Sequence, residues 1–343
     1  MSLQRACYVT DDAYEQELDS FFYERLYLGS KHDFSDANSY KSLLIGDYAI
    51  TSRATTNGVK AFNNVCLHRN NLIDPLGAGS REFKCGYHGW RYDAEGTLVQ
   101  APLCDMTSIK NKQLDTFPVA ESGGMLFAGL NGKSPQVSEV GQLLKTLDIS
   151  FEEAAFAEGE LLHKCNWKLL VENVLEGYHV NFVHKDSFVP GGGSSTLAGE
   201  TGLDSYTSWA KFYPDTPQIT HSLKYFPDAK HLYHHGFVFP NLFVANTNNL
   251  IGYAAYLLPI SKHETLLKWQ LFELPALRSL PSSVRQKIRE DAVNIVKQTL
   301  LEDKEVVESC QLGLQAKGPE AQLQPQEFRI GHFHNLYRSF SAK

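Results

Sequence analysis

Two short segments of the chain contain residue types that bind metal ions at close spacing. The first contains Cys66 and His68, and the second contains Cys85 and His88. Each segment therefore offers one thiolate and one imidazole. A two-iron, two-sulfur cluster of the kind that has two cysteines on one iron and two histidines on the other needs this ligand set. The two segments predict such a cluster.

A structural zinc ion is the alternative, because two cysteines and two histidines are also a zinc ligand set. Zinc sites usually take both cysteines from one short loop and both histidines from another. Here each loop supplies one of each, which favours a cluster with two metal ions. Arg69 and Trp90 follow the ligands, and either could shield the cluster sulfurs or simply pack.

The segments Cys-Leu-His-Arg at 66–69 and Cys-Gly-Tyr-His-Gly-Trp at 85–90 resemble the cluster loops of the Rieske non-haem iron oxygenases. These are the α subunits of ring-hydroxylating dioxygenases and related monooxygenases. The respiratory Rieske proteins are less similar, because they carry an extra cysteine in each loop and the two form a disulfide. Asn71 and Tyr87 stand at those positions here, so that disulfide cannot form.

A second candidate site lies in the segment 166–184. On a helical wheel, Glu172, Glu176 and His179 share one face. The opposite face is apolar and contains Trp167, Leu170, Val171, Val174, Leu175 and Tyr178. His184 would be turned well away from His179 by a continuous α-helix, so the helix must end or bulge between them if both bind one metal. From this pattern alone, a solvated polar face is an equal alternative.

The facial triad of oxygen-activating iron(II) consists of two histidines and one carboxylate and leaves coordination positions open. The resemblance extends to this segment, whose acid-x-x-His-x-x-x-x-His pattern is similar to the family's iron-binding helix and implies His179 and His184 as ligands. In the same way it implies Asp303 as the third ligand, on a helix predicted over about 281–312. Glu302 is the rival ligand, and a solvated acidic face is the simpler interpretation of the neighbouring glutamates.

The resemblance also implies a role for Glu176. In the similar enzymes the corresponding acid is most often Asp, and it bridges two subunits of a trimer. Glu176 would then connect His179 to His88 of the partner subunit and carry electrons between the cluster and the iron. Glu at this position is similar to the enzymes that oxidise carnitine, glycine betaine and related quaternary amines. Asn173 could hold water or oxygen near the iron, or cap local backbone.

The composition limits the class of protein. A chain of 343 residues is long enough for two domains, and an apolar fraction of 43% is ordinary for a globular protein. The sequence contains no apolar run long enough for a membrane span and no signal region at its start. A net charge of -7 argues against nucleic-acid binding. The remaining cysteines follow no disulfide framework, so we expect a cytoplasmic location.

We expect an α+β fold. Short β segments and an Asn57-Gly58 hairpin turn predict a small antiparallel Rieske [2Fe-2S] domain at 40–150. Residues 1–39 and 151–343 are then the catalytic domain, which by resemblance is a helix-capped antiparallel sheet with a mononuclear non-haem iron. A short helix is expected within 8–28, and a linker with a helix within 131–165.

The segment between the two parts of the iron site is the expected substrate region. A glycine-rich loop lies at 190–195, and it could be a lid or a plain surface loop. The aromatic residues that follow could form a cage for a quaternary ammonium group, or could equally be core: Tyr206, Trp209, Phe212, Tyr213, Tyr225 and Phe226. His231, His234 and His235 are interpreted as surface or pocket histidines rather than a metal site, and so are His332 and His334.

Together these features predict the oxygenase component of a multicomponent Rieske system. It would use O2 to hydroxylate or oxidatively dealkylate a small organic molecule, with a cationic amine or an aromatic compound as substrate. The chain has no Gly-x-Gly-x-x-Gly motif, so NAD(P)H and flavin would act through a separate reductase, with or without a ferredoxin. The alternatives are a pure electron carrier, which would not need the second metal segment, and a scaffold that has lost its iron.

Overall fold

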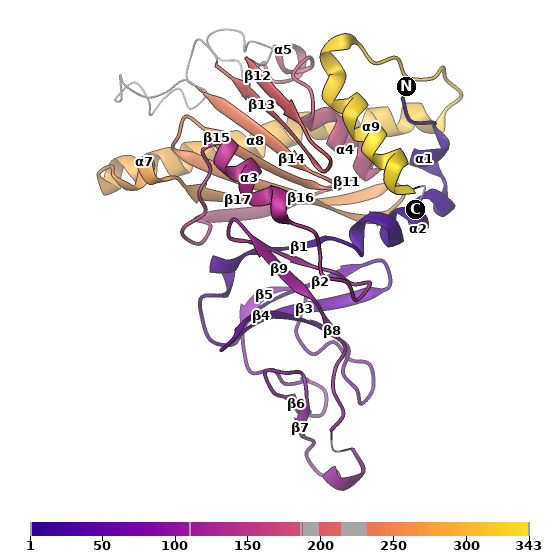
Figure 1. Cartoon of the computed structure of the whole chain (residues 1–343), viewed down its shortest axis with the longest axis vertical. Coiled ribbons are helices and arrows are strands. Elements are labelled where there is room, and N and C mark those ends of the chain that lie inside the picture. Colours follow the sequence, from indigo (N-terminus) through magenta and orange to yellow (C-terminus); the bar gives the residue numbers. More distant parts are fainter. Residues whose placement is uncertain (1, 110, 186, 188–198, 214–231, 342–343) are drawn as a thin grey trace. The chain divides into compact units, whose positions relative to one another are not determined.

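The computed structural model describes residues 2–109, 111–185, 187, 199–213 and 232–341 (Figure 1). The chain divides into two compact units. The cluster-loop unit consists of Phe21–Val137, and the large-sheet unit consists of Met1–Ser20 and Ser138–Lys343. The cluster-loop unit begins before residue 40 and ends before residue 150, the bounds that the sequence predicts for the Rieske domain. That functional division stays a prediction.

In its described residues, the cluster-loop unit contains three antiparallel sheets. The largest has the strand order β5-β2-β3-β4-β8 and comprises β2 (Ser39–Ile45), β3 (Tyr48–Thr55), β4 (Gly58–Asn63), β5 (Gly77–Ser80) and β8 (Thr116–Phe117). The second comprises β1 (Leu26–Ser30), β9 (Val119–Ser122) and β10 (Met125–Ala128), and the third β6 (Arg91–Tyr92) and β7 (Leu98–Gln100). The expected hairpin joins β3 to β4, with Gly58 at a φ of 104° that favours glycine.

The large-sheet unit is built on a seven-stranded antiparallel sheet with the order β11-β17-β16-β15-β14-β13-β12. Its strands are β11 (Ala157–His163), β12 (Glu200–Leu203), β13 (Thr207–Phe212), β14 (Tyr233–Val238), β15 (Leu242–Thr247), β16 (Ile251–Ser261) and β17 (Glu264–Glu273). Its helices are α1 (Ala6–Val9), α2 (Asp11–Glu17), α3 (Ser138–Thr146), α4 (Trp167–Val174), α5 (Val180–Val183), α7 (Pro275–Arg278), α8 (Ser282–Gln315) and α9 (Phe328–Ser341).

The alternation of side chains along β14 separates the two faces of this sheet. His234 and Gly236 lie on the face that carries α3, where a Cβ on Gly236 would come within 2.6 Å of the Leu147 side chain that follows the helix. Tyr233 and His235 lie on the opposite face, where they share a cavity with residues of α8 (Figure 1). The sheet therefore has helices on both faces, and α8 covers the face with the cavity.

These elements confirm the α+β class, and the helix predicted over 281–312 is α8. The helix expected within 8–28 is not one element, because α1 and α2 are followed by a π-helix at Leu18–Phe22 and then by β1. The segment 131–165, predicted as a linker with a helix, contains α3 and also the edge strand β11. Within the described residues, no helix is long and apolar enough to cross a membrane.

Candidate metal centres

The two cluster loops have equivalent backbone frames. Isolated β-bridges close them, Val65 to Leu72 in the first loop and Lys84 to Arg91 in the second. Inside each bridge, the N–H of the cysteine donates to a carbonyl five residues later, at 2.9 Å in the first loop and 2.8 Å in the second. Asn70 and Gly89 then adopt positive φ angles of 55° and 73°. The Cys-x-His and Cys-x-x-His spacings are thus presented by two loops of the same kind.

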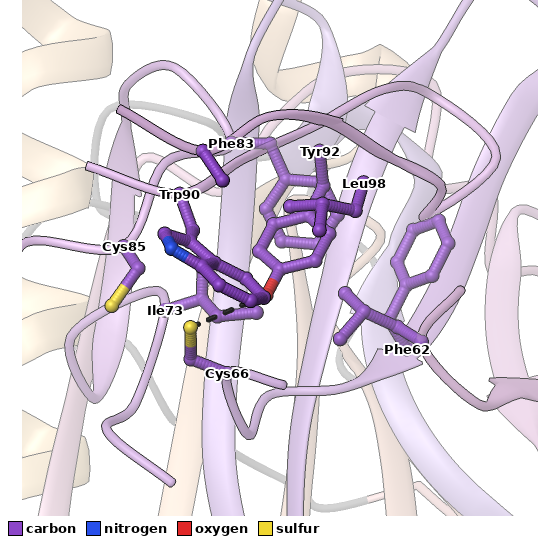
Figure 2. Close-up of a cluster of buried hydrophobic side chains, with 10 residues drawn as sticks. Phe62, Cys66, Ile73, Phe83, Cys85, Trp90, Tyr92 and Leu98 are labelled. Carbon is purple, nitrogen blue, oxygen red and sulfur yellow. Dashed lines mark hydrogen bonds between the residues drawn. The ribbon is translucent and has the colours of Figure 1, made fainter. Parts of the chain in front are cut away.

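Within these loops the thiols are buried and the imidazoles are exposed. Cys66 and Cys85 are 1% and 2% exposed and belong to a hydrophobic cluster with Trp90 and Tyr92 (Figure 2). His68 and His88 are exposed, and their ring centroids lie 4.5 Å apart. The indole of Trp90 stacks on the His68 ring at 4.9 Å. One side of the site is therefore shielded and the histidine side faces outward.

Two side chains donate hydrogen bonds to the sulfurs. The Tyr92 hydroxyl lies 3.2 Å from Cys66 Sγ (Figure 2) and accepts the Leu67 N–H at 3.1 Å. Toward a metal-bound thiolate, which has no proton, the hydroxyl is the donor. Asn71 Nδ2 donates to Cys85 Sγ at 3.6 Å. Neither donor has a signature in the sequence, although Asn71 stands in place of the disulfide cysteine of the respiratory Rieske proteins.

This environment fits a positively charged group between the loops. Burial raises the pKa of the Cys66 thiol, while the hydrogen bond from Tyr92 acts to lower it. A metal ion favours the thiolate and so offsets the burial. Two buried thiols with donors aimed at them, next to two exposed imidazoles, suit a [2Fe-2S] cluster held by both residue types.

In the large-sheet unit, three predicted ligands come together. His179, His184 and Asp303 each offer an atom within 4.8 Å of the others. Asp303 Oδ1 lies 3.0 Å from His184 Nε2 and 3.6 Å from His179 Nε2, and this buried oxygen has no hydrogen-bond partner among the described residues. A carboxylate oxygen that faces two imidazole nitrogens without a hydrogen bond fits a divalent cation, and this donor set suits iron(II).

The two histidines are positioned by a helix break before His179 and by a second helix end between them, at Val183, and this second end is the one that the sequence predicts. Helix α4 ends at Val174, and the short helix α5 separates His179 at its N-cap from His184 at its C-cap. The side chain of Glu176 accepts the N–H groups of Tyr178 and His179, which replaces the helical pattern at this point. Tyr178, predicted on the buried face, is consequently 51% exposed.

A carboxylate lies behind each imidazole. Glu176 contacts His179 Nδ1, and Glu302 Oε2 contacts His184 Nδ1 at 2.8 Å. Such contacts fix the proton on Nδ1 and leave Nε2 as the metal-facing atom. Burial acts to lower the pKa of His184, but Asp303 and Glu302 raise it overall. Glu302, the rival ligand in the sequence analysis, therefore lies on the far side of His184 from Asp303.

Glu172 does not share the face of Glu176 and His179, which corrects the helical-wheel expectation. Its carboxylate accepts from the Tyr8 hydroxyl and lies 2.9 Å from His334 Nε2, and His334 is buried. The wheel assumed a continuous helix to His179, whereas α4 ends before Glu176. Glu172 therefore ties α4 to the N-terminal helices and to α9.

A fully buried ion pair holds the start of α4 in place. Lys168 Nζ lies 2.5 Å from Glu17, and the same carboxylate accepts from Trp167 Nε1 at 2.7 Å and from the Tyr337 hydroxyl at 2.7 Å. Lys168 is 0% exposed and Glu17 is 1% exposed. Because every charge in this cluster is paired and hydrogen-bonded, the position of α4 relative to α2 and α9 is strongly specified.

A cavity of about 140 Å³ adjoins the triad, with Asp303 on its wall. Its lining is mostly apolar and includes the rings of Tyr233 and Tyr253 and the side chain of His235. Val174, at the end of α4, also lines it, and the neighbouring Asn173 is partly buried. An engineered protein cavity of about this size holds benzene, so a small organic molecule fits.

Several residues predicted for the substrate region lie elsewhere. The four described members of the aromatic set are absent from the cavity lining: Tyr206, Trp209, Phe212 and Tyr213. Tyr206 instead packs on Phe340. Tyr225, Phe226, His231 and the loop 190–195 lie outside the described residues.

The two histidines on β14 differ in position. His235 lines the cavity, as a pocket histidine should, while His234 lies on the other face with Nδ1 3.2 Å from the Leu147 carbonyl. Both side chains are buried, which excludes the surface interpretation for this pair. His332, near the C terminus, contacts the Asp204 carbonyl at 2.9 Å.

Comparison with known families gives two matches along the chain. Residues 24–118 match the Rieske [2Fe-2S] domain, and residues 151–342 match the ring hydroxylating alpha subunit (catalytic domain). The match at 24–118 includes both cluster loops, and the match at 151–342 includes the three residues of the triad.

Individual relatives include two amine monooxygenases. The carnitine monooxygenase oxygenase subunit of Escherichia coli K12 is 25% identical over 96% of this chain and 91% of its own length. The glycine betaine monooxygenase oxygenase subunit of Chromohalobacter salexigens is 29% identical, but the alignment spans 48% of this chain and 39% of that protein. A solved quaternary ammonium Rieske monooxygenase has the same fold, with a TM-score of 0.81 at 19% identity over 98% of this chain and 94% of that one.

Proposed function

This chain belongs to the ring-hydroxylating alpha subunits of the Rieske oxygenases, and from that premise we propose which residues hold its metals and which kind of molecule it oxidises. Members of this family are oxidoreductases that use O2, with a Rieske [2Fe-2S] cluster, a mononuclear iron and electrons from a separate component. We propose Cys66, His68, Cys85 and His88 as the cluster ligands. The equivalent backbone frames of the two loops and the sulfur hydrogen bonds support this assignment.

We assign the mononuclear iron to His179, His184 and Asp303. The observation that carries this proposal is the convergence of their three ligand atoms within 4.8 Å, beside a cavity that can take a small molecule. Iron bound there supplies dioxygen activation in the coordination positions that three protein ligands leave open. The protein contributes the orientation of both imidazoles, through Glu176 and Glu302, and a mostly apolar chamber beside them.

The substrate that we favour is a small amine-type molecule, which the enzyme hydroxylates or oxidatively dealkylates. Three observations support it. The relatives above act on carnitine and glycine betaine, Glu176 matches the acid found in enzymes for such amines, and the cavity offers the rings of Tyr233 and Tyr253 to a cation. Val174 at the end of α4 lines this chamber, and we assign the preceding residue, Asn173, to hold water or O2 near the iron.

Oxidation of an aromatic compound is the second candidate. The cavity wall favours it, because most of its side chains are aliphatic: Val174, Ala245, Ile251, Leu271, Ala292, Ile295, Val296 and Leu300. A flat apolar ring would fill such a space with no charge to accommodate.

We further propose that the protein works as a homotrimer with a separate NAD(P)H-dependent reductase, with or without a ferredoxin. Glu176 would connect His179 to His88 of the partner subunit and so provide the route for electrons. The outward-facing side of the cluster loops supports this, since His88 is exposed and Tyr87 is 54% exposed. Next to the iron ligands, Phe182 is 68% exposed, as expected for a surface covered by another copy.

A single-turnover experiment tests the proposed function. The iron-loaded, chemically reduced protein is mixed with ¹⁸O₂ and either γ-butyrobetaine or naphthalene, and products are analysed by mass spectrometry. Incorporation of ¹⁸O into the amine, or loss of its oxidised carbon as a fragment, supports the first candidate, and a labelled naphthalene diol the second. A His179→Ala protein that keeps its cluster spectrum and its full yield would refute the iron assignment. Sedimentation of the same sample tests the trimer.

A further inference from the structure

We propose that His235 binds a carboxylate of the substrate, supported from behind by Arg329, so that the molecule oxidised here is a small carboxylic acid. This inference rests on the proposed function and names the substrate class for the same cavity. It assigns a hydrogen-bond donor to the cavity, from a residue that the sequence predicts only as a surface or pocket histidine.

The contacts of His235 leave one of its nitrogens unused. His235 is 3% exposed and lines the cavity whose wall includes Asp303. Nδ1 lies 3.2 Å from Arg329 Nη2. The other nitrogen, Nε2, is buried and has no hydrogen-bond partner among the described residues. A buried polar atom without a partner destabilises a protein, so its presence beside a cavity indicates that a ligand group completes it.

Arg329 determines which nitrogen carries the proton. A guanidinium has only donors, so Nδ1 of His235 must accept and the proton must lie on Nε2. Burial lowers the pKa of His235 well below its usual value, and the charge of Arg329 lowers it further, so the ring is neutral. His235 is therefore a neutral imidazole with a fixed Nε2–H donor, and the group that it binds must be an acceptor.

Arg329 itself has no counter-ion among the described residues. It is 4% exposed, and besides His235 it contacts the hydroxyl and carbonyl oxygens of Ser208, each at 3.3 Å. Within the described ranges, no carboxylate lies at salt-bridge distance from it. Burial lowers its pKa to about 9, which reflects the cost of holding a cation in this environment. A substrate that brings a negative charge to His235 would stabilise Arg329, and a neutral acceptor would do so less.

The arrangement also orients the substrate. The positive charge of Arg329 and the carboxylate of Asp303 both affect Tyr233, whose hydroxyl pKa is raised to about 12, mainly by burial. Tyr233 therefore lies within electrostatic reach of both ends of the cavity. A carboxylate at His235 would place the rest of the molecule along the apolar wall, with its far carbon toward the triad. An ammonium group, if present, is repelled from Arg329 and lies nearer the tyrosine rings.

Calorimetry on the iron-loaded protein under argon tests this proposal with matched ligand pairs. The pairs are γ-butyrobetaine with its primary amide, and 3-phenylpropanoate with its primary amide. We expect the acid of at least one pair to bind about 10- to 100-fold more tightly than its amide, the usual effect of a charge-assisted hydrogen bond. Equal binding of acid and amide in both pairs, or no binding of either acid, overturns the proposal.

Variants then assign the preference to His235. His235→Phe and Arg329→Met should each reduce the ratio of acid to amide affinity to near one, while His235→Gln, which keeps an N–H donor, should retain part of it. His234→Gln is the matched control, because His234 lies next along β14 on the opposite face, and it should keep the full ratio. If the variants do not fold, the comparison of acid and amide binding to the wild-type protein still tests the proposal. A His235→Phe protein that keeps the full preference contradicts the assignment.

Binding is measured without turnover, so the two proposals can fail separately. Acid preference without any oxidised product would leave this inference standing and refute the proposed function. Oxidation of the amides at the same rate as the acids, with no preference in affinity, would refute this inference and leave the proposed function standing.

Discussion

The two metal centres of this chain are built from different kinds of structure. The cluster centre takes its four proposed ligands from two neighbouring loops, each closed by its own backbone hydrogen bonds. The iron centre takes two ligands from the end of α4 and the turns around α5, and the third from α8, much later in the chain. The cluster centre is therefore formed by local backbone structure, whereas the iron centre depends on how helices distant in sequence pack together.

The ligands of the two centres also differ in how exposed they are to solvent. The histidines of the cluster loops face outward, whereas His184 is 3% exposed and Asp303 is 8% exposed. An exposed imidazole edge suits the exchange of electrons with another protein, and a largely buried triad beside a mostly apolar cavity suits the oxidation of a small organic molecule. We therefore expect that substitutions far in sequence from the iron ligands, in the helices that pack around them, damage the iron centre and leave the cluster centre intact.

The largest effect is expected from Asp303→Asn. The variant should lose the mononuclear iron and keep the cluster, so that iron falls from about three to about two per chain. Product formation should fall at least about a thousandfold, since a metal ion contributes several kcal/mol to such reactions. Metal analysis and the visible spectrum measure the two centres separately. Glu305→Gln, an exposed position on the same helix, is the control. Normal turnover in the Asp303→Asn variant would show that Asp303 does not hold a catalytic iron, and the chain would then have no second metal centre of the proposed kind.

Glu17→Ala should come next, through the packing that positions α4. It leaves Lys168 buried without its partner, which costs about 3–5 kcal/mol. We expect a lower midpoint of thermal unfolding and weaker iron binding, with an unchanged cluster spectrum. Glu121→Ala breaks the exposed pair with Lys31 and should change stability by less than about 1 kcal/mol. Equal effects of the two substitutions would show that the buried pair does not specify the position of α4.

The contrast between the centres also explains what the sequence could predict. The spacing of Cys66, His68, Cys85 and His88 lies within two loops, so the ligand types and their spacing were sufficient to predict the cluster. The fold class and α8 followed from periodicity and resemblance. The cavity lining was predicted less well, because residues from β14 to β17 meet α8 only after the chain has folded.

The helical segment shows where periodicity stops being informative. A wheel assumes one continuous helix, but the side chain of Glu176 takes the N–H groups that would continue α4. Glu172 consequently lies with Tyr8 and His334, at opposite ends of the chain. No local pattern could reveal these partners, since their contacts span almost the whole sequence. Neither could it separate Asp303 from Glu302, which are adjacent in sequence and lie on different sides of His184.

Glu302→Gln tests whether Glu302 supports His184 from behind or binds the metal itself, and its effect on iron binding should be smaller than that of Asp303→Asn. The variant keeps the side-chain shape but weakens the charge that orients His184 through Nδ1. Loss of such an outer partner typically reduces metal affinity by 10- to 100-fold. Titration of the apo protein with iron(II) under argon should show this reduction, and excess iron should restore the metal content. Complete loss of iron at saturating concentration would instead make Glu302 a ligand and Asp303 the wrong assignment.

The smallest effect should arise in the cluster loops, where Tyr92→Phe removes one hydrogen bond to Cys66 Sγ. A donor at the sulfur stabilises the reduced cluster, which carries the extra negative charge, so its loss should lower the reduction potential. A hydrogen bond worth about 0.5–1.5 kcal/mol corresponds to about 20–60 mV for one electron. A redox titration followed by circular dichroism measures the shift. Tyr87→Phe alters a ring beside His88 without a sulfur contact and should leave the potential unchanged. A raised potential in the Tyr92 variant would contradict a hydrogen bond from the hydroxyl to the cluster sulfur. The affinity for iron at the other centre should not change in either variant.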